Sequence, residues 1–235
     1  LAPTGRASKR LSESTTLPAS TIHRFLKWNK ENNTFAINEY NPDFSQLIIV
    51  DEVSMIDIAL MDNLLKGLTN NIKLVLVGDH NQLPSVGPGM LLKDLIDSEV
   101  IDTVHLDILY RQKENSYIPV LANEIRNDDL GDFLSTKDDY TFLACNGNSI
   151  ISNLTKICKQ IIDKGYDYKS FQVMAPMYAG INGIDNLNKA LQNIFNPSSS
   201  DKKEVKYGDI VYRVNDKVLQ LVNDPDNNIF NGDIG

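Results

Sequence analysis

Apolar residues in the first part of the chain form short continuous runs that are typical of strands. Residues 47–50 (LIIV) favour a strand that is buried on both faces of a parallel sheet. Residues 72–77 (IKLVLV) predict a second strand, and residues 103–107 predict a short third one. The first run ends at two acids and the second at Gly78-Asp79, so both predicted strands stop at polar turns.

Between these runs the apolar spacing changes to that of a helix. Leu60, Leu64 and Leu68 recur every four residues and form one apolar face, and Asp57 stands where a helix N-cap is needed. Residues 89–97 predict a further helix. Strands separated by helices of this length predict βαβ units, and therefore a parallel sheet.

The second half of the chain continues the alternation. Helical spacing predicts helices over residues 151–161 and 184–194, and residues 171–174 predict a strand. Residues 198–203 are polar and predict a loop, whereas residues 209–222 predict two strands around Asn215-Asp216.

The predicted fold class is therefore α/β, with helices on both faces of a parallel sheet. The first series of strands and helices ends near residues 110–115, which divides the chain into predicted domains 1–112 and 113–235. Hydrophobic residues make up 42% and charged residues 23% of the chain, which excludes a disordered, collagen-like or coiled-coil protein. No stretch approaches the ~20 apolar residues that a membrane span needs, so we predict no membrane partner.

Charge and cysteine content narrow the function classes further. Lysine plus arginine number 23 and aspartate plus glutamate 31, so the formal net charge is −8. This balance disfavours a non-specific DNA coat but permits a local nucleic-acid groove. Two cysteines, Cys145 and Cys158, are too few for a disulfide scaffold and predict a reducing, cytoplasmic compartment. The chain begins without methionine or a signal peptide and stops within a predicted strand and turn, so we expect a piece of a longer protein.

Two adjacent carboxylates follow the first apolar run. Asp51 and Glu52 stand at the carboxyl end of a predicted parallel strand, where α/β sheets bind ligands. Asp51 suits Mg²⁺ held through water, and Glu52 suits orienting or deprotonating a water that attacks a phosphate. A solvated strand end beside the helix cap is the alternative interpretation of this pair alone.

A second polar turn, GDHNQLPSVG at residues 78–87, follows the second predicted strand. We expect both turns at the same edge of the sheet because the strands are parallel. Gln82 is neutral and carries both a donor and an acceptor, so it can contact a γ-phosphate or the attacking water. An isolated Gly-Asp would indicate a plain turn, but the whole string beside Asp51 and Glu52 favours a phosphate site.

Arg111 lies just after the third predicted strand, at the predicted domain boundary. A guanidinium there can stabilise charge that develops on a transferring phosphoryl group, although a surface arginine is the simpler interpretation of that residue alone. A P-loop, G-x-x-x-x-G-K-[ST], does not occur in the sequence. We therefore expect negligible ATPase activity from this chain by itself.

Several strings occur in an order that resembles the successive motifs of RecD-like superfamily 1 DNA helicases, the family of the exodeoxyribonuclease V alpha subunit. They are APTGRA at 2–7, TIHR at 21–24, IVDEVSM at 49–55, GDHNQLPSVG at 78–87 and YRQ at 110–112. APMY at 175–178, GIDNLN at 183–188 and FNGDIG at 230–235 fit the same family. The resemblance covers nearly the whole chain, and the string at 78–87 is highly specific.

The resemblance implies a RecA-like P-loop NTPase motor domain, incomplete here and followed by part of a second one. It implies a DNA recombination and repair enzyme that uses ATP and Mg²⁺ to move 5′ to 3′ on single-stranded DNA. Duplex ends or forks are the implied substrates, and nuclease or helicase subunits are compatible partners.

The same resemblance implies roles for individual residues. Asp51 would bind Mg²⁺, Glu52 would activate water, Gln82 would sense the γ-phosphate and Arg111 would act as an arginine finger. The implied DNA contacts are Thr4, Gly5, Arg6, Thr21, His23, Pro176, Met177 and Tyr178. A helix that opens at Thr4 and Gly5 can hold a phosphate on its first amides. His23 stands among apolar neighbours, so a structural histidine is an equal alternative.

The sequence departs from the family pattern and leaves other functions open. The P-loop, the later T-x-H-K-x-x-G motif and the final arginine motif are absent, and Tyr110 stands where many relatives carry phenylalanine. One alternative is a non-catalytic nucleic-acid-binding or subunit-interaction module with a relic NTPase fold. Another is a P-loop ATPase of a different superfamily that acts on RNA or protein.

Overall fold

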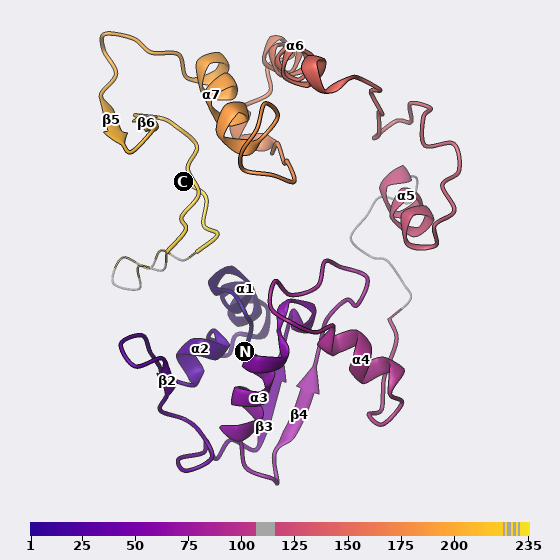
Figure 1. Cartoon of the computed structure of the whole chain (residues 1–235), viewed down its shortest axis with the longest axis vertical. Helices are drawn as coiled ribbons and strands as arrows, with labels where there is room; N and C mark the ends of the chain where they lie inside the picture. Colours follow the sequence, from indigo (N-terminus) through magenta and orange to yellow (C-terminus); the bar gives the residue numbers. More distant parts are fainter. Residues whose placement is uncertain (107–115, 223, 225–226, 228, 230) are drawn as a thin grey trace. The chain divides into compact units, whose positions relative to one another are not determined.

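The computed structural model describes residues 1–106, 116–222, 224, 227, 229 and 231–235. Its contacts divide the chain into two compact units, Leu1–Tyr110 with Leu219–Gly235, and Arg111–Val218. Figure 1 traces both units. The units differ from the predicted domains because residues 219–235 belong with the first unit; the domain division itself stays a prediction.

A parallel pair of strands forms the centre of the first unit (Figure 1). Strand β3 (Leu47–Val50) pairs with β4 (Lys73–Leu76) in a register that joins Leu47 to Lys73 and Val50 to Leu76. Leu1 extends the sheet on the other edge of β3: its nitrogen donates to the carbonyl oxygen of Ile49 at 2.6 Å. Its own carbonyl accepts from the amide of Asp51 at 2.9 Å. A mixed α/β fold with a parallel sheet is therefore confirmed.

Helices connect these segments, and the side chains of Thr4, Thr21 and Asp57 cap the N-termini of three of them. Thr4 caps the first helix by accepting a hydrogen bond from the amide of Ala7, and Asp57 caps a later one through the amide of Leu60 at 2.7 Å, as predicted. Besides β3 and β4, the first unit contains α1 (Gly5–Thr15), α2 (Ile22–Phe25), β1 (Trp28–Asn29), β2 (Thr34–Phe35), η1 (Val53–Met55), α3 (Ile58–Lys66) and α4 (Leu91–Asp97). Strands β1 and β2 pair as an antiparallel hairpin.

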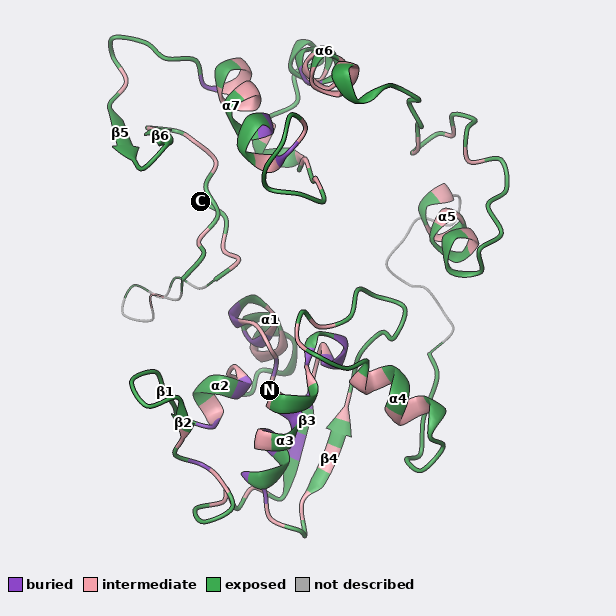
Figure 2. Ribbon diagram, in the orientation of Figure 1, coloured by how far each residue is buried: buried purple, intermediate pink, exposed green. Residues whose placement is uncertain are grey.

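The core of the first unit lies against one face of β3. Ile48 and Val50 are buried in one cluster with Met61 and Leu64 of α3 and with residues of α2. Leu47 and Ile49 point to the opposite face and are 52% and 40% exposed, as the alternating colours of β3 in Figure 2 show. The prediction of burial on both faces is therefore wrong for the described residues, because the core cluster covers only one face.

The predicted third strand is not present. Residues 103–106 form no strand, and residue 107 lies outside the described residues. Val104 and Leu106 are 85% and 90% exposed, so an apolar composition alone did not produce a strand here. A strand requires hydrogen bonds from a neighbouring strand, and local sequence does not supply that neighbour.

The second unit contains helices and an antiparallel hairpin. Its elements are α5 (Tyr117–Arg126), η2 (Gly147–Ser149), α6 (Ile150–Asp163), η3 (Tyr168–Ser170), α7 (Ile184–Phe195), β5 (Glu204–Tyr207) and β6 (Ile210–Arg213). The helices predicted over 151–161 and 184–194 are confirmed as α6 and α7. None of the helices in the described ranges is long and apolar enough to cross a membrane.

Two strand predictions in this unit are wrong. Residues 171–174 form no strand. The hairpin turns at Gly208-Asp209 rather than at Asn215-Asp216, and Gly208 has the positive φ of +58° that such a turn favours. The carboxylate of Asp216 instead accepts hydrogen bonds at 2.7 Å from Gln192 and Asn196 of the α7 end. Asp216 therefore anchors the hairpin to α7.

Candidate functional site

The carboxyl ends of β3 and β4 are joined by backbone hydrogen bonds. The amide of Val77 donates to the carbonyl of Val50 at 2.8 Å, and the amide of Val53 donates to the carbonyl of Val77 at 3.0 Å. Asp51 and Glu52 occupy the turn after β3, and residues 78–82 occupy the turn after β4. The structure thus brings the two polar turns together at the end of the sheet formed by the carboxyl ends of β3 and β4, hereafter the sheet edge.

The acidic pair has a defined backbone geometry. Asp51 Oδ1 accepts a hydrogen bond from the amide of Glu52 at 2.9 Å. Glu52 adopts a left-handed conformation, with φ 55° and ψ 42°, which costs about 1–2 kcal/mol for a residue with a Cβ. Both residues are partly exposed. A strained turn of this kind places carboxylate oxygens at the sheet edge, where functional sites commonly store such strain.

Asp51 can serve as one ligand of a hydrated Mg²⁺ ion. In the described part of the chain, no group of three or more His, Cys, Asp or Glu side chains gathers to hold a metal ion. Mg²⁺ is typically bound by one or two carboxylates and otherwise by water and phosphate oxygens. A single carboxylate at an open sheet edge fits that requirement.

Gly78 allows the two turns to approach closely. A Cβ at this position would lie 3.1 Å from the nitrogen of Val53, 3.2 Å from the nitrogen of Ser54 and 2.8 Å from Cδ2 of Leu92. Any side chain would push the turn after β4 away from η1. The glycine of the GDHNQ string is therefore required by packing at this edge.

Gln82 lies in a tight turn beside a small recess. Its amide donates to the carbonyl of Asp79 at 3.1 Å. The recess has a volume of ≈ 20 Å³ and is lined by Ser54, His80, Gln82, Pro84, Met90, Leu92 and Lys93. Ser54 is a lining residue that sequence reasoning missed; the available signal was a small polar residue two positions after Glu52.

The first group of predicted DNA contacts lies at the same sheet edge. Ala2 forms a parallel bridge with Thr21, through hydrogen bonds of 3.1 Å from its amide to Ser20 and 3.0 Å to its carbonyl from Ile22. Thr4 follows this bridge and caps α1, and Thr21, the bridged residue itself, caps α2. Gly5 is the buried first residue of α1, and Arg6 beside it is exposed.

His23 is held in an aromatic cluster. Its ring centroid lies 5.8 Å from that of Trp28, edge to face, and 5.9 Å from that of Phe35. Desolvation lowers the pKa of His23 below its usual value of 6.5, while the negative charge of Asp57 acts in the opposite direction. The cluster orients the imidazole, a geometry compatible with both interpretations of this residue.

The remaining predicted residues do not belong to the described part of the first unit. Pro176, Met177 and Tyr178 belong to the second unit, where the carbonyls of Met177 and Tyr178 accept hydrogen bonds from the amides of Ile184 and Asp185. Met177 and Tyr178 are 63% and 74% exposed. Arg111 lies outside the described residues.

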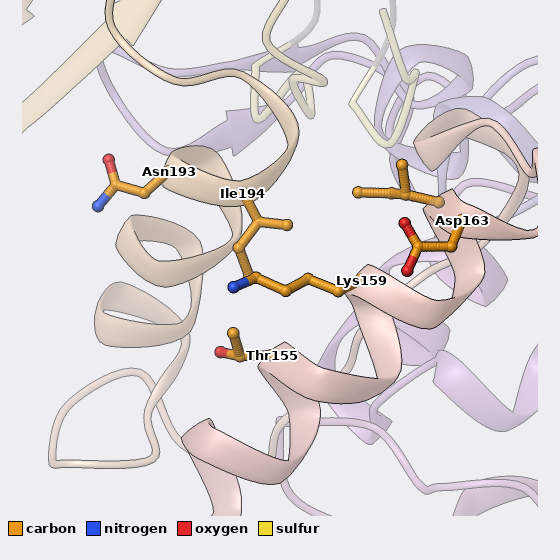
Figure 3. Close-up of a pocket in the computed structure, with 6 residues that line it drawn as sticks. Thr155, Lys159, Asp163, Asn193 and Ile194 are labelled. Carbon is orange, nitrogen blue, oxygen red and sulfur yellow. The ribbon is translucent and has the colours of Figure 1, made fainter.

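A second hollow lies between α6 and α7. Its volume is ≈ 360 Å³, and it is lined by Thr155, Lys159, Ile162, Asp163, Asn193 and Ile194. Figure 3 shows Thr155, Lys159 and Asp163 along α6, with Ile194 of α7 beside them. It contains none of the predicted site residues.

Comparisons with known proteins agree with these motifs. Residues 1–148 match the family described as AAA domain, and residues 187–235 match the SH3 domain of ATP-dependent RecD-like DNA helicases. The ATP-dependent RecD2 DNA helicase of Deinococcus radiodurans is 34% identical over 234 residues, which is 100% of this chain and 31% of that protein. The RecBCD enzyme subunit RecD of Buchnera aphidicola is 34% identical over 140 residues, which is 58% of this chain and 23% of that protein. The chain spans less than a third of the length of these relatives.

A solved structure described as the basis for DNA unwinding at forked dsDNA by two coordinating Pif1 helicases resembles the fold. The match covers 100% of this chain and 59% of the Pif1 chain, with a TM-score of 0.50 and 19% sequence identity. At this identity the likeness concerns the fold alone.

Proposed function

The chain belongs to the AAA-domain family, and from this and its similarity to RecD-like DNA helicases we propose that it forms part of an ATP-dependent DNA helicase. The observation that carries the proposal is the shared sheet edge. Asp51 and Glu52 follow β3, the Gln82 turn follows β4, and the Val53–Val77 hydrogen bond joins the two turns. In α/β sheets this edge is where nucleotides bind.

Each residue of the edge has a proposed task in ATP hydrolysis. Asp51 is a ligand of Mg²⁺, which neutralises charge on the phosphate oxygens when bound. Glu52 orients the attacking water and accepts its proton, and Gln82 contacts the γ-phosphate or that water. Arg111 is proposed to stabilise the charge that develops on the transferring phosphoryl group.

Single-stranded DNA is the proposed track. Thr4, Gly5 and Arg6 open α1, and amides at a helix N-terminus together with an exposed arginine can hold a backbone phosphate. Thr21 and His23 begin the adjacent helix α2. Pro176, Met177 and Tyr178 are proposed contacts from the second unit, where the exposed ring of Tyr178 is suited to stacking on a base.

The directional and assembly aspects are also proposals. We infer movement 5′ to 3′, with duplex ends or forks as substrates and a role in recombination and repair, from the resemblance of the motifs to RecD-like helicases. The names of the relatives support the helicase activity itself. One relative is named as an enzyme subunit, so partner nuclease or helicase subunits are included in the proposal.

The test is ATP hydrolysis by the full-length protein that contains this chain. We expect single-stranded DNA to stimulate turnover and Glu52→Gln to abolish it. Turnover that ignores both DNA and Glu52, or no turnover, would support a binding module instead. Stimulation by RNA but not by DNA would indicate an ATPase of another kind. The 235-residue chain by itself should hydrolyse ATP negligibly because it contains no P-loop.

A further inference from the structure

Ser54 is a buried polar residue whose hydroxyl has no hydrogen-bond partner among the described residues. The side chain lies in η1, two residues after Glu52, and the residue is 9% exposed. Its Oγ is buried and unpaired, whereas the other buried serine of this unit, Ser8, donates to the carbonyl of Gly5 at 2.8 Å. Buried hydroxyls are normally paired, so an unpaired one calls for an explanation.

Ser54, whose hydroxyl is unpaired, lines the same recess as Gln82. The recess volume of ≈ 20 Å³ exceeds the roughly 10–15 Å³ that one water molecule requires. Gln82 can both donate and accept a hydrogen bond through its side-chain amide. Lys93, another lining residue, already forms an ion pair with Asp97 of α4. The other lining residues with polar side chains are His80 and Gln82.

Ser54 also stands at the junction of the two polar turns. Its neighbour Val53 donates to the carbonyl of Val77, and a Cβ at Gly78 would lie only 3.2 Å from the backbone nitrogen of Ser54. The backbone on both sides of the recess is therefore held in place. The two turns are thus joined through the backbone, whereas the Ser54 side chain makes no hydrogen bond to either turn.

We propose that Ser54 is a positioning residue that holds the side chain of Gln82 through hydrogen bonds to the single water that the recess accommodates. The role rests on the proposed function, because Gln82 acts there on the γ-phosphate. These bonds connect the acidic turn after β3 to the sensing turn after β4. A buried hydroxyl left unpaired lowers stability, so its presence is explained by an action on Gln82 rather than by folding.

The experiment compares single-stranded-DNA-stimulated ATPase activity and thermal unfolding of the full-length protein and its variants. Ser54→Ala should lower kcat about tenfold, which is the size of one lost hydrogen bond, and leave KM for ATP unchanged. Its melting temperature should equal or exceed that of the wild type. Ser54→Thr retains the hydroxyl and should restore most of the rate. Ser98→Ala, at an exposed serine that donates to the carbonyl of Leu95, is the matched control and should behave as the wild type.

A double-mutant cycle tests whether Ser54 acts through Gln82. The variant Ser54→Ala/Gln82→Ala should be no slower than Gln82→Ala alone, because the partner is already absent. Additive losses would overturn the proposal, because Ser54 would then act independently of Gln82. His80, which also lines the recess, would be the next residue to test. Wild-type activity in Ser54→Ala, or a lost rate accompanied by a lower melting temperature, would also overturn it. A wild-type protein without DNA-stimulated turnover would overturn the proposed function itself, which is a distinguishable result.

Discussion

The amide of Val53 donates a 3.0 Å hydrogen bond to the carbonyl oxygen of Val77, two residues whose neighbours carry the polar chemistry of the sheet edge. Val53 directly follows Glu52, and Val77 directly precedes Gly78. The hydrogen bond therefore joins the two turns through the backbone. A γ-phosphate contacted at Gln82 and a water held at Glu52 would be coordinated by this connection.

Gly78→Ala should separate the two turns. The new Cβ would meet the nitrogens of Val53 and Ser54 at 3.1 and 3.2 Å, so the backbone must shift. We expect the free energy of unfolding to fall by about 1–3 kcal/mol in urea titrations, with a loss of ATPase activity in the full-length protein. Gly147→Ala is the control, since its Cβ would meet its nearest atom at 3.6 Å. Equal stability of the two variants would contradict the close packing at Gly78.

Glu52→Gln should preserve ATP binding and lower hydrolysis by about 10²–10⁴-fold, because the amide cannot accept the proton of water. Nucleotide binding is measured by fluorescence titration and turnover by phosphate release. Glu99→Gln is a matched control at another glutamate with a left-handed backbone, φ 54°, which is exposed, and should leave turnover unchanged. Loss of ATP binding in Glu52→Gln would argue against its assignment to water activation.

The pKa of His23 predicts a specific dependence of stability on pH. Desolvation beside Trp28 and Phe35 lowers this pKa below 6.5 in the folded protein, so the unfolded chain binds more protons as the solution is acidified. The contribution to stability is complete above pH 6.5 and is lost as pH falls towards the lowered value. Urea unfolding from pH 7.5 to about 5 measures it.

His23→Phe should remove this pH-dependent component while keeping an aromatic ring in the cluster. His105→Phe, at an exposed histidine in a coil segment, should leave the component in place. Identical pH profiles for the wild type and His23→Phe would show that the cluster does not perturb the imidazole.

Asp57→Ala should destabilise the start of α3. Its Oδ1 accepts the amide of Leu60 at 2.7 Å, and loss of such a cap typically costs about 0.5–2 kcal/mol. Asp57→Ser retains a capping oxygen and should recover most of the loss. Chemical denaturation of both variants measures the difference, and an unchanged Asp57→Ala would mean that the cap adds nothing.

Helices with strong periodicity were predictable, whereas one helix was missed. The segments containing α3, α6 and α7 each present an apolar face at helical spacing. Helix α5 escaped prediction because Pro119 interrupts its pattern. Proline is tolerated there because it lies in the first turn, where the amide needs no partner within the helix. Besides the local N-cap Ser116, the distant Asp139 accepts a hydrogen bond from the amide of Tyr117 at 3.0 Å.

Strand predictions failed where pairing depended on distant residues. Asn215-Asp216 has the residue types of a turn, yet the Asp216 carboxylate accepts hydrogen bonds from Gln192 and Asn196, and the hairpin turns earlier.

Leu68 lies beyond the end of α3 but is still buried in the core, so the four-residue spacing identified a core position rather than a helical one.

The sequence by itself determined the chemistry of the sheet edge. An apolar strand followed by Asp51 and Glu52, and another followed by the Gln82 turn, must place those groups together once the strands pair in parallel. Only the tertiary structure decided that Ser54 would be buried without a partner beside Gln82, and that Leu47 and Ile49 would be exposed. Burial and hydrogen-bond satisfaction depend on which distant segments cover a residue, and local pattern carries no record of them.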